Sequence, residues 1–209
     1  MTTVLHIGQI DVTNALAELG VRHDILEQAV LAGEHSRNEC TWADPPNTPG
    51  FIAWARTLRR LKELLVREGW TGNDYAVLRP DGRLAISVTT GDEAAGNPDR
   101  TPKTKYPKGA STEVAIQRNR RQLNLFDPAS NREILEGPRP DEVQTWMLVR
   151  RRVNDTVFLE LSLPSDLGED GRVEEWGARI ILGPVALEPE PMPGQGDSQA
   201  IEIDIRRRS

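Results

Sequence analysis

The sequence has 209 residues and a formal net charge of -6, with 37% hydrophobic and 28% charged residues. This length suits one fairly large domain, or a small domain with an appendage. One cysteine, Cys40, excludes an internal disulfide and indicates a reducing compartment. The sequence shows neither a signal peptide nor an apolar run long enough for a membrane span, so we expect a cytoplasmic protein with no membrane partner.

The first third of the chain has the periodicity of helices. The pattern predicts a short helix over residues 11–19, capped by Asp11, and a second helix over about residues 22–35. The proline-rich run 42–50 interrupts the helical pattern, because proline lacks a backbone donor. The clearest helix is expected over residues 51–67, where apolar side chains recur every three or four positions. Its stripe consists of Phe51, Trp54, Ala55, Leu58, Leu61, Leu64 and Leu65.

From Trp70 onward the apolar period changes to two, which is typical of strands. Residues 75–79 and 83–88 flank the turn Pro80-Asp81-Gly82 and predict a β-hairpin. A second hairpin and a further strand are expected later in the chain. The hairpin strands are residues 145–149 and 156–163, and the further strand is residues 178–182.

These elements predict an α+β fold in which N-terminal helices pack on an antiparallel sheet built from two β-hairpins. We expect a single domain over residues 1–186, with a helical part at about 11–68 and a sheet part at about 73–186. Residues 187–199 have the composition of a proline-rich linker, and residues 200–209 predict an edge strand and a basic tail. All five tryptophans are expected to be core anchors. They are Trp42, Trp54, Trp70, Trp146 and Trp176.

The most informative segment is a basic island, residues 100–121, which has seven Lys/Arg against Glu113 alone. Such an excess indicates an anionic partner or an acidic face of the protein itself, such as Asp92, Glu93 or the C-terminal carboxylates. The island begins in a polar loop, residues 90–109, which we expect to be mobile, and continues into a predicted helix whose free N–H groups favour anions. The candidate anion- or partner-binding residues are Lys103, Lys105, Lys108, Gly109, Ser111, Thr112, Arg118 and Arg121.

No complete catalytic or metal-binding pattern is found in the sequence. His6, His23 and His35 share no ligand spacing with Cys40. Residues 166–173 match a calcium loop only in part, because a central carboxylate and the bidentate Glu are absent. We therefore expect no metal ion and no cofactor, and we favour a non-catalytic protein over an enzyme.

The functional prediction is a binding or accessory protein of a bacterial cytosolic assembly, engaging its partner partly through the basic loop. A protein partner is slightly favoured over nucleic acid, because the net charge of -6 repels a duplex. Two alternatives stay open. One is an enzyme acting on a phosphorylated or nucleic-acid substrate, and the other is a structural homo-oligomer joined by edge-strand addition through Ile201, Ile203 and Ile205.

Several phrases of the sequence resemble an uncharacterised family of bacterial proteins. They are Cys40-Thr41 with Asp44-Pro45-Pro46 and Pro49-Gly50, Thr104 to Gly109, Gln122 to Phe126, and Glu160 to Pro164 with Asp170 to Val173. The resemblance implies a setting among mobile-element or phage-defence gene clusters. It implies no activity, cofactor or site residue.

Overall fold

The computed structural model describes residues 3–125 and 143–187. Within these ranges the helices are α1 (Gln9–Leu19), α2 (His23–Asn38), α3 (Thr48–Val66) and α4 (Ala110–Leu125). The strands are β1 (Val4–His6), β2 (Thr71–Gly72), β3 (Ala76–Leu78), β4 (Leu84–Thr90), β5 (Gln144–Val153), β6 (Thr156–Leu167) and β7 (Val173–Ala186). All of these strands belong to one sheet, in the order β1-β7-β6-β5-β4-β3-β2.

The sheet is mixed, which corrects the prediction of an antiparallel one, while the α+β class is confirmed. Both predicted hairpins are present, as the antiparallel pairs β3–β4 and β5–β6. The pairs β4–β5 and β1–β7 are parallel. Residue alternation identifies a strand and a tight turn identifies its antiparallel neighbour, but neither specifies how strands far apart in the sequence pair. A parallel pair needs a long crossover, here residues 91–143 with α4.

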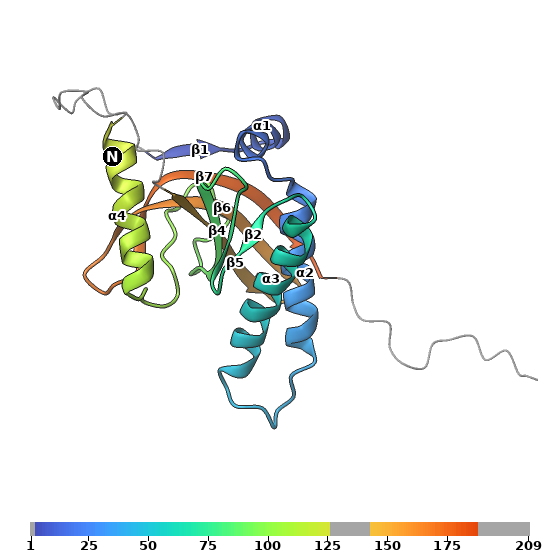
Figure 1. Cartoon of the computed structure of the whole chain (residues 1–209). Helices are drawn as coiled ribbons and strands as arrows, with labels where there is room; N and C mark the ends of the chain where they lie inside the picture. Colours follow the sequence, from blue (N-terminus) through green and yellow to red (C-terminus); the bar gives the residue numbers. More distant parts are fainter. Residues whose placement is uncertain (1–2, 126–142, 188–209) are drawn as a thin grey trace, which may run out of the picture.

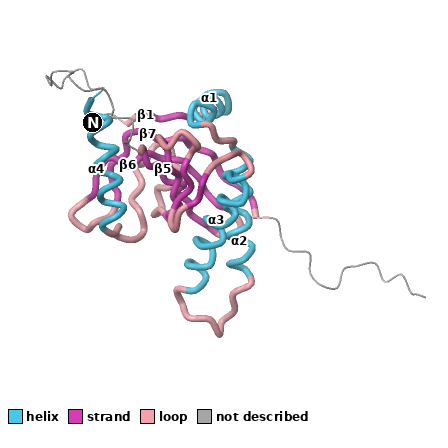
Figure 2. Tube along the Cα trace, in the orientation of Figure 1, coloured by secondary structure: helices cyan, strands magenta, loops and turns pink. Residues whose placement is uncertain are grey.

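Helices cover both faces of the sheet, as Figures 1 and 2 show, with α4 opposite the α2–α3 hairpin. Alternate residues of β5 supply the two hydrophobic cores, because successive strand side chains point to opposite faces. Trp146 and Leu148 join the larger core, which contains buried residues of α1, α2 and α3. Met147 and Val149 join the smaller core, which contains Ile116 of α4.

The hairpin of α2 and α3 extends beyond the sheet (Figure 1). The predicted stripe of α3 is largely correct, because Leu58, Leu61 and Leu65 are all buried. Gly33 permits the close packing of the two helices, since a Cβ atom there would lie 2.1 Å from the Thr57 hydroxyl oxygen. Phe51 is an exception to the stripe and is 61% exposed.

Trp42 corrects the prediction that every tryptophan is a core anchor. It lies in the loop between α2 and α3 and is 97% exposed. Trp70, Trp146 and Trp176 are buried as predicted, and Trp54 is half-buried. Residue type alone did not distinguish Trp42, because the proline-rich loop that carries it leaves the packed layers.

Two local predictions also change. Helix α1 begins at Gln9 after Gly8, so Asp11 is not its cap; the Asp11 carboxylate instead accepts a hydrogen bond from the Ile7 N–H at 3.0 Å. Strand β7 is longer than the predicted 178–182. Of the predicted linker 187–199, the structure describes Leu187, which is buried, and the predicted edge strand lies outside the described residues.

Among the described helices, none combines the length and apolar character needed to cross a membrane.

Candidate functional site: an aromatic cleft at the edge of β4

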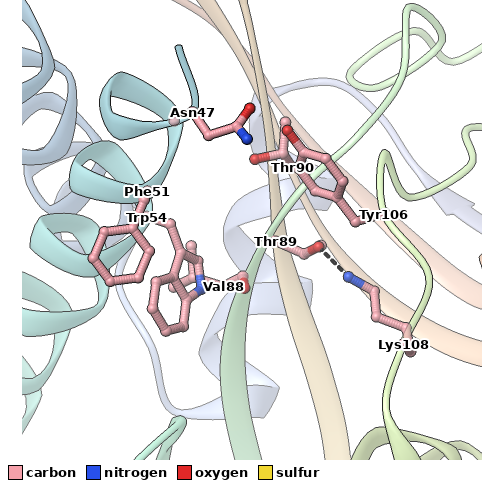
Figure 3. Close-up of a pocket in the computed structure, with 9 residues that line it drawn as sticks. Asn47, Phe51, Trp54, Val88, Thr89, Thr90, Tyr106 and Lys108 are labelled. Atoms are coloured by element: carbon pink, nitrogen blue, oxygen red, sulfur yellow. Dashed lines mark hydrogen bonds between the residues drawn. The ribbon is translucent and has the colours of Figure 1, made fainter. Parts of the chain in front are cut away.

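A cleft of about 440 Å³ lies beside the C-terminal end of β4. Strand β3 pairs with β4 only at Ala85, Ile86 and Ser87, so the last three residues of β4, Val88 to Thr90, have no β3 neighbour. These residues lie between the two walls of the cleft, as Figure 3 shows. The beginning of α3 forms one wall and the loop after β4 forms the other. The cleft therefore exists because β3 is too short to cover the edge of β4.

The α3 wall is aromatic. The indole Nε1 of Trp54 donates a hydrogen bond to the Val88 carbonyl oxygen at 3.0 Å, which attaches the helix to the strand edge. Phe51 packs against Trp54 with its ring centroid 5.7 Å away. Tyr106, which is 56% exposed, faces these rings from the opposite wall (Figure 3). This arrangement leaves aromatic surface open to a ligand.

Lys108 supplies the positive charge of the cleft. Its backbone N–H donates to the Gly171 carbonyl at 2.8 Å, and its Nζ donates to the Thr89 hydroxyl at 2.6 Å (Figure 3). Burial lowers the pKa of Lys108 to about 8, because a desolvated ammonium is disfavoured. Among the described residues no carboxylate forms an ion pair with Lys108.

Three other members of the basic island are already neutralised. These ion pairs are Arg100–Glu93 at 3.2 Å, Lys103–Glu174, and Arg120–Asp166 at 2.9 Å. These ion pairs agree with the second of the two interpretations of the basic island, in which its side chains pair with acidic residues of the protein itself. The island is therefore not a continuous free cationic surface.

The loop that carries the island is hydrogen-bonded along much of its course. Thr104 is buried and donates its backbone N–H to the Val173 carbonyl at 3.0 Å. The Lys105 N–H donates to the Thr90 carbonyl at 2.8 Å, and the Trp176 indole donates to the Pro102 carbonyl at 2.8 Å. These bonds fix the backbone that presents Tyr106 and Lys108 to the cleft.

The other predicted site residues lie outside the cleft. Lys105 has its ammonium 5.6 Å from the centroid of the Tyr106 ring. Gly109 accepts hydrogen bonds from the amides of the first turn of α4, at 2.9 Å from Thr112. The remaining residues are exposed positions of α4, namely Ser111, Arg118 and Arg121. Of the candidate residues predicted from the sequence, the structure places Lys108 in the cleft and does not bring the others to it.

A buried ionic cluster lies beside the α3 wall. The Glu34 carboxylate pairs with the Arg150 guanidinium, with Arg152 at 3.3 Å and with Arg37 at 3.7 Å. Arg150 also reaches the carbonyl of Gly50, which lines the cleft, at 3.5 Å. Three guanidinium groups share one carboxylate, so the cluster keeps a formal surplus of positive charge. This surplus adds to the anion preference of Lys108.

Comparison with known proteins does not assign the chain to a family. No family model, curated protein or solved structure matches the chain. In the described part of the chain, no group of three or more His, Cys, Asp and Glu side chains is arranged to hold a metal ion. The site is therefore interpreted from its geometry.

Sequence reasoning missed the aromatic wall of the cleft. Phe51 and Trp54 were assigned to the core stripe of α3, because their three-residue spacing matches its apolar face. Their position in the first turns, directly after the proline-rich run 42–50, is the signal that distinguishes them from Leu58 and Leu61. Tyr106 stands among prolines and lysines, and its sequence context gave no sign that it faces Phe51.

Proposed function

We propose that the protein is a non-catalytic binding module whose cleft receives an acidic side chain of a protein partner together with neighbouring apolar groups. The observation that carries the proposal is the largely buried Lys108 ammonium, which hydrogen-bonds to Thr89 and forms no ion pair with a described carboxylate. A buried cation without a counterion costs free energy, and an incoming carboxylate compensates for that cost. The aromatic rings beside it suit apolar contact.

A protein partner fits the geometry better than a nucleic acid. A nucleic acid needs several cations along its phosphates, and its affinity grows with the number of these contacts. Arg100, Lys103 and Arg120 of the island are held by carboxylates of this protein. One ammonium that is unpaired among the described residues and faces an aromatic wall suits a single carboxylate, and the net charge of -6 opposes a polyanion.

Two short peptides test the proposal directly. The probes are fluorescein-labelled Ala-Pro-Glu-Pro-Ala and the same peptide with Gln in place of Glu, titrated into the full chain by fluorescence anisotropy. We expect the Glu peptide to bind at least about tenfold more tightly, because a hydrogen bond to a charged group contributes about 1.5–3 kcal/mol. Equal binding of the two peptides overturns the proposal.

Variants of the same loop locate the binding site. Lys108→Met should abolish the preference for the Glu peptide, whereas Lys105→Ala removes one charge from outside the cleft and should change affinity less than about threefold. Labelled oligothymidylate is the competing probe. Tight binding of oligothymidylate that Lys108→Met removes would instead support the nucleic-acid alternative.

The pH dependence follows from the state of Lys108. The pKa of Lys108 is lowered to about 8, so the ammonium that attracts a carboxylate is lost as the pH rises through that value. Affinity for the Glu peptide should fall about tenfold per pH unit above pH 8 and stay constant below it, down to the pKa of the peptide carboxylate. The Gln peptide is the control and should show no such fall.

A further inference from the structure

We propose that the cleft is also a covalent site, at which the Nζ of Lys108 forms an imine with an aromatic aldehyde. This reaction is separate from the proposed function, because a carboxylate binds the ammonium form of Lys108, whereas an aldehyde reacts with the neutral amine. Three features carry it: the position of the amine in a cleft, the uncharged group that holds it, and the aromatic surface beside it.

Lys108 is fixed where a small ligand has room. Of the three lysines in the loop after β4, Lys108 is the one that lines the cleft of about 440 Å³. Its backbone N–H donates to the Gly171 carbonyl, and the Lys105 N–H attaches the loop to the Thr90 carbonyl, both at 2.8 Å. A volume of this size suits a small organic ligand. The amine is therefore presented to the cleft from a fixed backbone.

Thr89 holds the amine without supplying a charge. Its hydroxyl oxygen accepts a hydrogen bond from the Lys108 Nζ at 2.6 Å, as Figure 3 shows, and no carboxylate of the described residues forms an ion pair with Lys108. A carboxylate would stabilise the ammonium, which has no lone pair and is not a nucleophile. Burial lowers the pKa of Lys108 to about 8, so that neutral amine is present near pH 7.

The charged groups around the cleft favour the same neutral form. No Asp or Glu is among the residues that line the cleft. Arg150 reaches the carbonyl oxygen of Gly50, which lines the α3 wall, at 3.5 Å. In the turn between β6 and β7, Asp170 is paired with Arg172 at 3.5 Å. A nearby cation disfavours a second positive charge, which is one of the ways in which proteins activate a lysine.

The other two lysines of the loop have different surroundings. Lys103 is paired with Glu174, and this hydrogen bond raises its pKa. Lys105 is exposed and lies outside the cleft. At pH 7 an amine with a pKa of about 8 is neutral in roughly one molecule in ten, and an ordinary lysine, with a pKa of about 10.4, in roughly one in 2,500. Lys103 and Lys105 are therefore internal references for the reactivity of Lys108.

The reaction needs no oxidant, reductant or cofactor. The lone pair of the neutral Nζ attacks the aldehyde carbon, and both hydrogens of Nζ leave with the carbonyl oxygen as one water molecule. A C=N bond thus replaces the C=O bond. Phe51 and Tyr106 line the same cleft and offer ring faces to the ring of the aldehyde, which favours an aromatic aldehyde over a small aliphatic one.

Reductive trapping of the full chain tests the proposal. Benzaldehyde and sodium cyanoborohydride at pH 7 convert an imine into a stable benzylamine, which peptide mapping by mass spectrometry locates. Cleavage after Glu93 and Glu113 places Lys103, Lys105 and Lys108 on one peptide, so their labelling is compared within one spectrum. We expect Lys108 to be labelled at least about tenfold faster than the other two, because a larger share of it is neutral.

The α-amino group of the chain is the positive control, because its ordinary pKa of about 8 also leaves it partly neutral at pH 7. Labelling of the α-amino group with equal, slow labelling of Lys108 and Lys105 overturns the proposal. The peptide titration is read separately. Fast labelling of Lys108 without a preference for the Glu peptide supports the covalent site and rejects the carboxylate site, and the reverse pair of results rejects the covalent site alone.

A second aldehyde tests the class of ligand. With acetaldehyde in place of benzaldehyde, the ratio of Lys108 to Lys103 labelling should be at least about threefold smaller, because acetaldehyde has no ring to pack in the cleft. Phe51→Ala replaces a side chain that is 61% exposed and should remove the excess for benzaldehyde. An equal ratio for the two aldehydes, or an excess that survives in Phe51→Ala, overturns the assignment of an aromatic ligand.

Discussion

Lys103 and Lys108 belong to the same loop, and their surroundings give them opposite properties. Lys103 is exposed, and its hydrogen bond to Glu174 raises its pKa. Lys108 is largely buried against a hydroxyl, and burial lowers its pKa to about 8. The comparison teaches that the charge of a basic segment does not predict a binding surface until the partner of each cation is known. One end of the loop is a structural surface and the other end borders a cleft.

A similar contrast holds between Glu160 and Glu34, the two buried carboxylates among the residues that the structure describes. Glu160 accepts hydrogen bonds from the Ser162 hydroxyl at 2.9 Å and from the Gly96 N–H at 3.0 Å, and it pairs with Arg179. Arg179 in turn donates to the carbonyl oxygens of Arg100 and Asn97. This network attaches the loop after β4 to β6 and β7 with one carboxylate for one guanidinium. The Glu34 cluster beside the cleft carries three guanidinium groups instead.

The largest expected effect tests the structural side of this comparison. Glu160→Gln leaves the buried Arg179 charge without its counterion, which should lower the free energy of unfolding by about 3–5 kcal/mol. Chemical denaturation measures the change. Ser162→Ala is the control at the same carboxylate and should cost about 1 kcal/mol. A loss below 1 kcal/mol in Glu160→Gln would show that the network does not hold the loop.

The second-largest expected effect is an increase in the free energy of unfolding, and it tests the cleft. Lys108→Met removes an ammonium whose burial is not compensated by a described carboxylate, so near pH 7 it should stabilise the protein by about 1–3 kcal/mol while removing peptide binding. The sign follows from linkage: a lysine whose pKa is lowered in the folded state destabilises the fold below that pKa, and the cost disappears as the pH rises from about 8 toward the unfolded value.

Denaturation of native and Lys108→Met protein at several pH values measures this difference. The stabilisation should be largest below pH 8 and should disappear as the pH rises above 10.5, where the lysine becomes neutral in the unfolded chain too. A destabilised variant at every pH would mean that Lys108 already has a stabilising partner in the folded protein.

The smallest expected effect is at the other end of the loop. Lys103→Ala removes an exposed ion pair, and such pairs contribute little in water, so the denaturation midpoint should stay within experimental error of the native value. The peptide affinity should also be unchanged, since Lys103 does not line the cleft. A large effect on either property would remove the distinction between Lys103 and Lys108.

The sequence determined the local structure of this protein to a considerable extent. The helix periodicity around Leu58 and Leu61 and the hairpin turn at Pro80-Asp81-Gly82 depend on residues close in the chain, and the structure contains both features. The basic island was equally visible, because charge can be counted without knowing the fold.

Tertiary structure decided the rest, because it depends on residues that are distant in the chain. The parallel pairing of β4 with β5 and of β1 with β7 is set by how the layers pack, and alternation does not record it. The partners of the basic residues are also remote in sequence, since Lys103 meets Glu174 on β7 while Lys108 meets Thr89 on β4. Three-dimensional packing brings Phe51 and Tyr106 to opposite walls of one cleft, and it leaves Lys108, on the same wall as Tyr106, without a carboxylate from the described part of the chain.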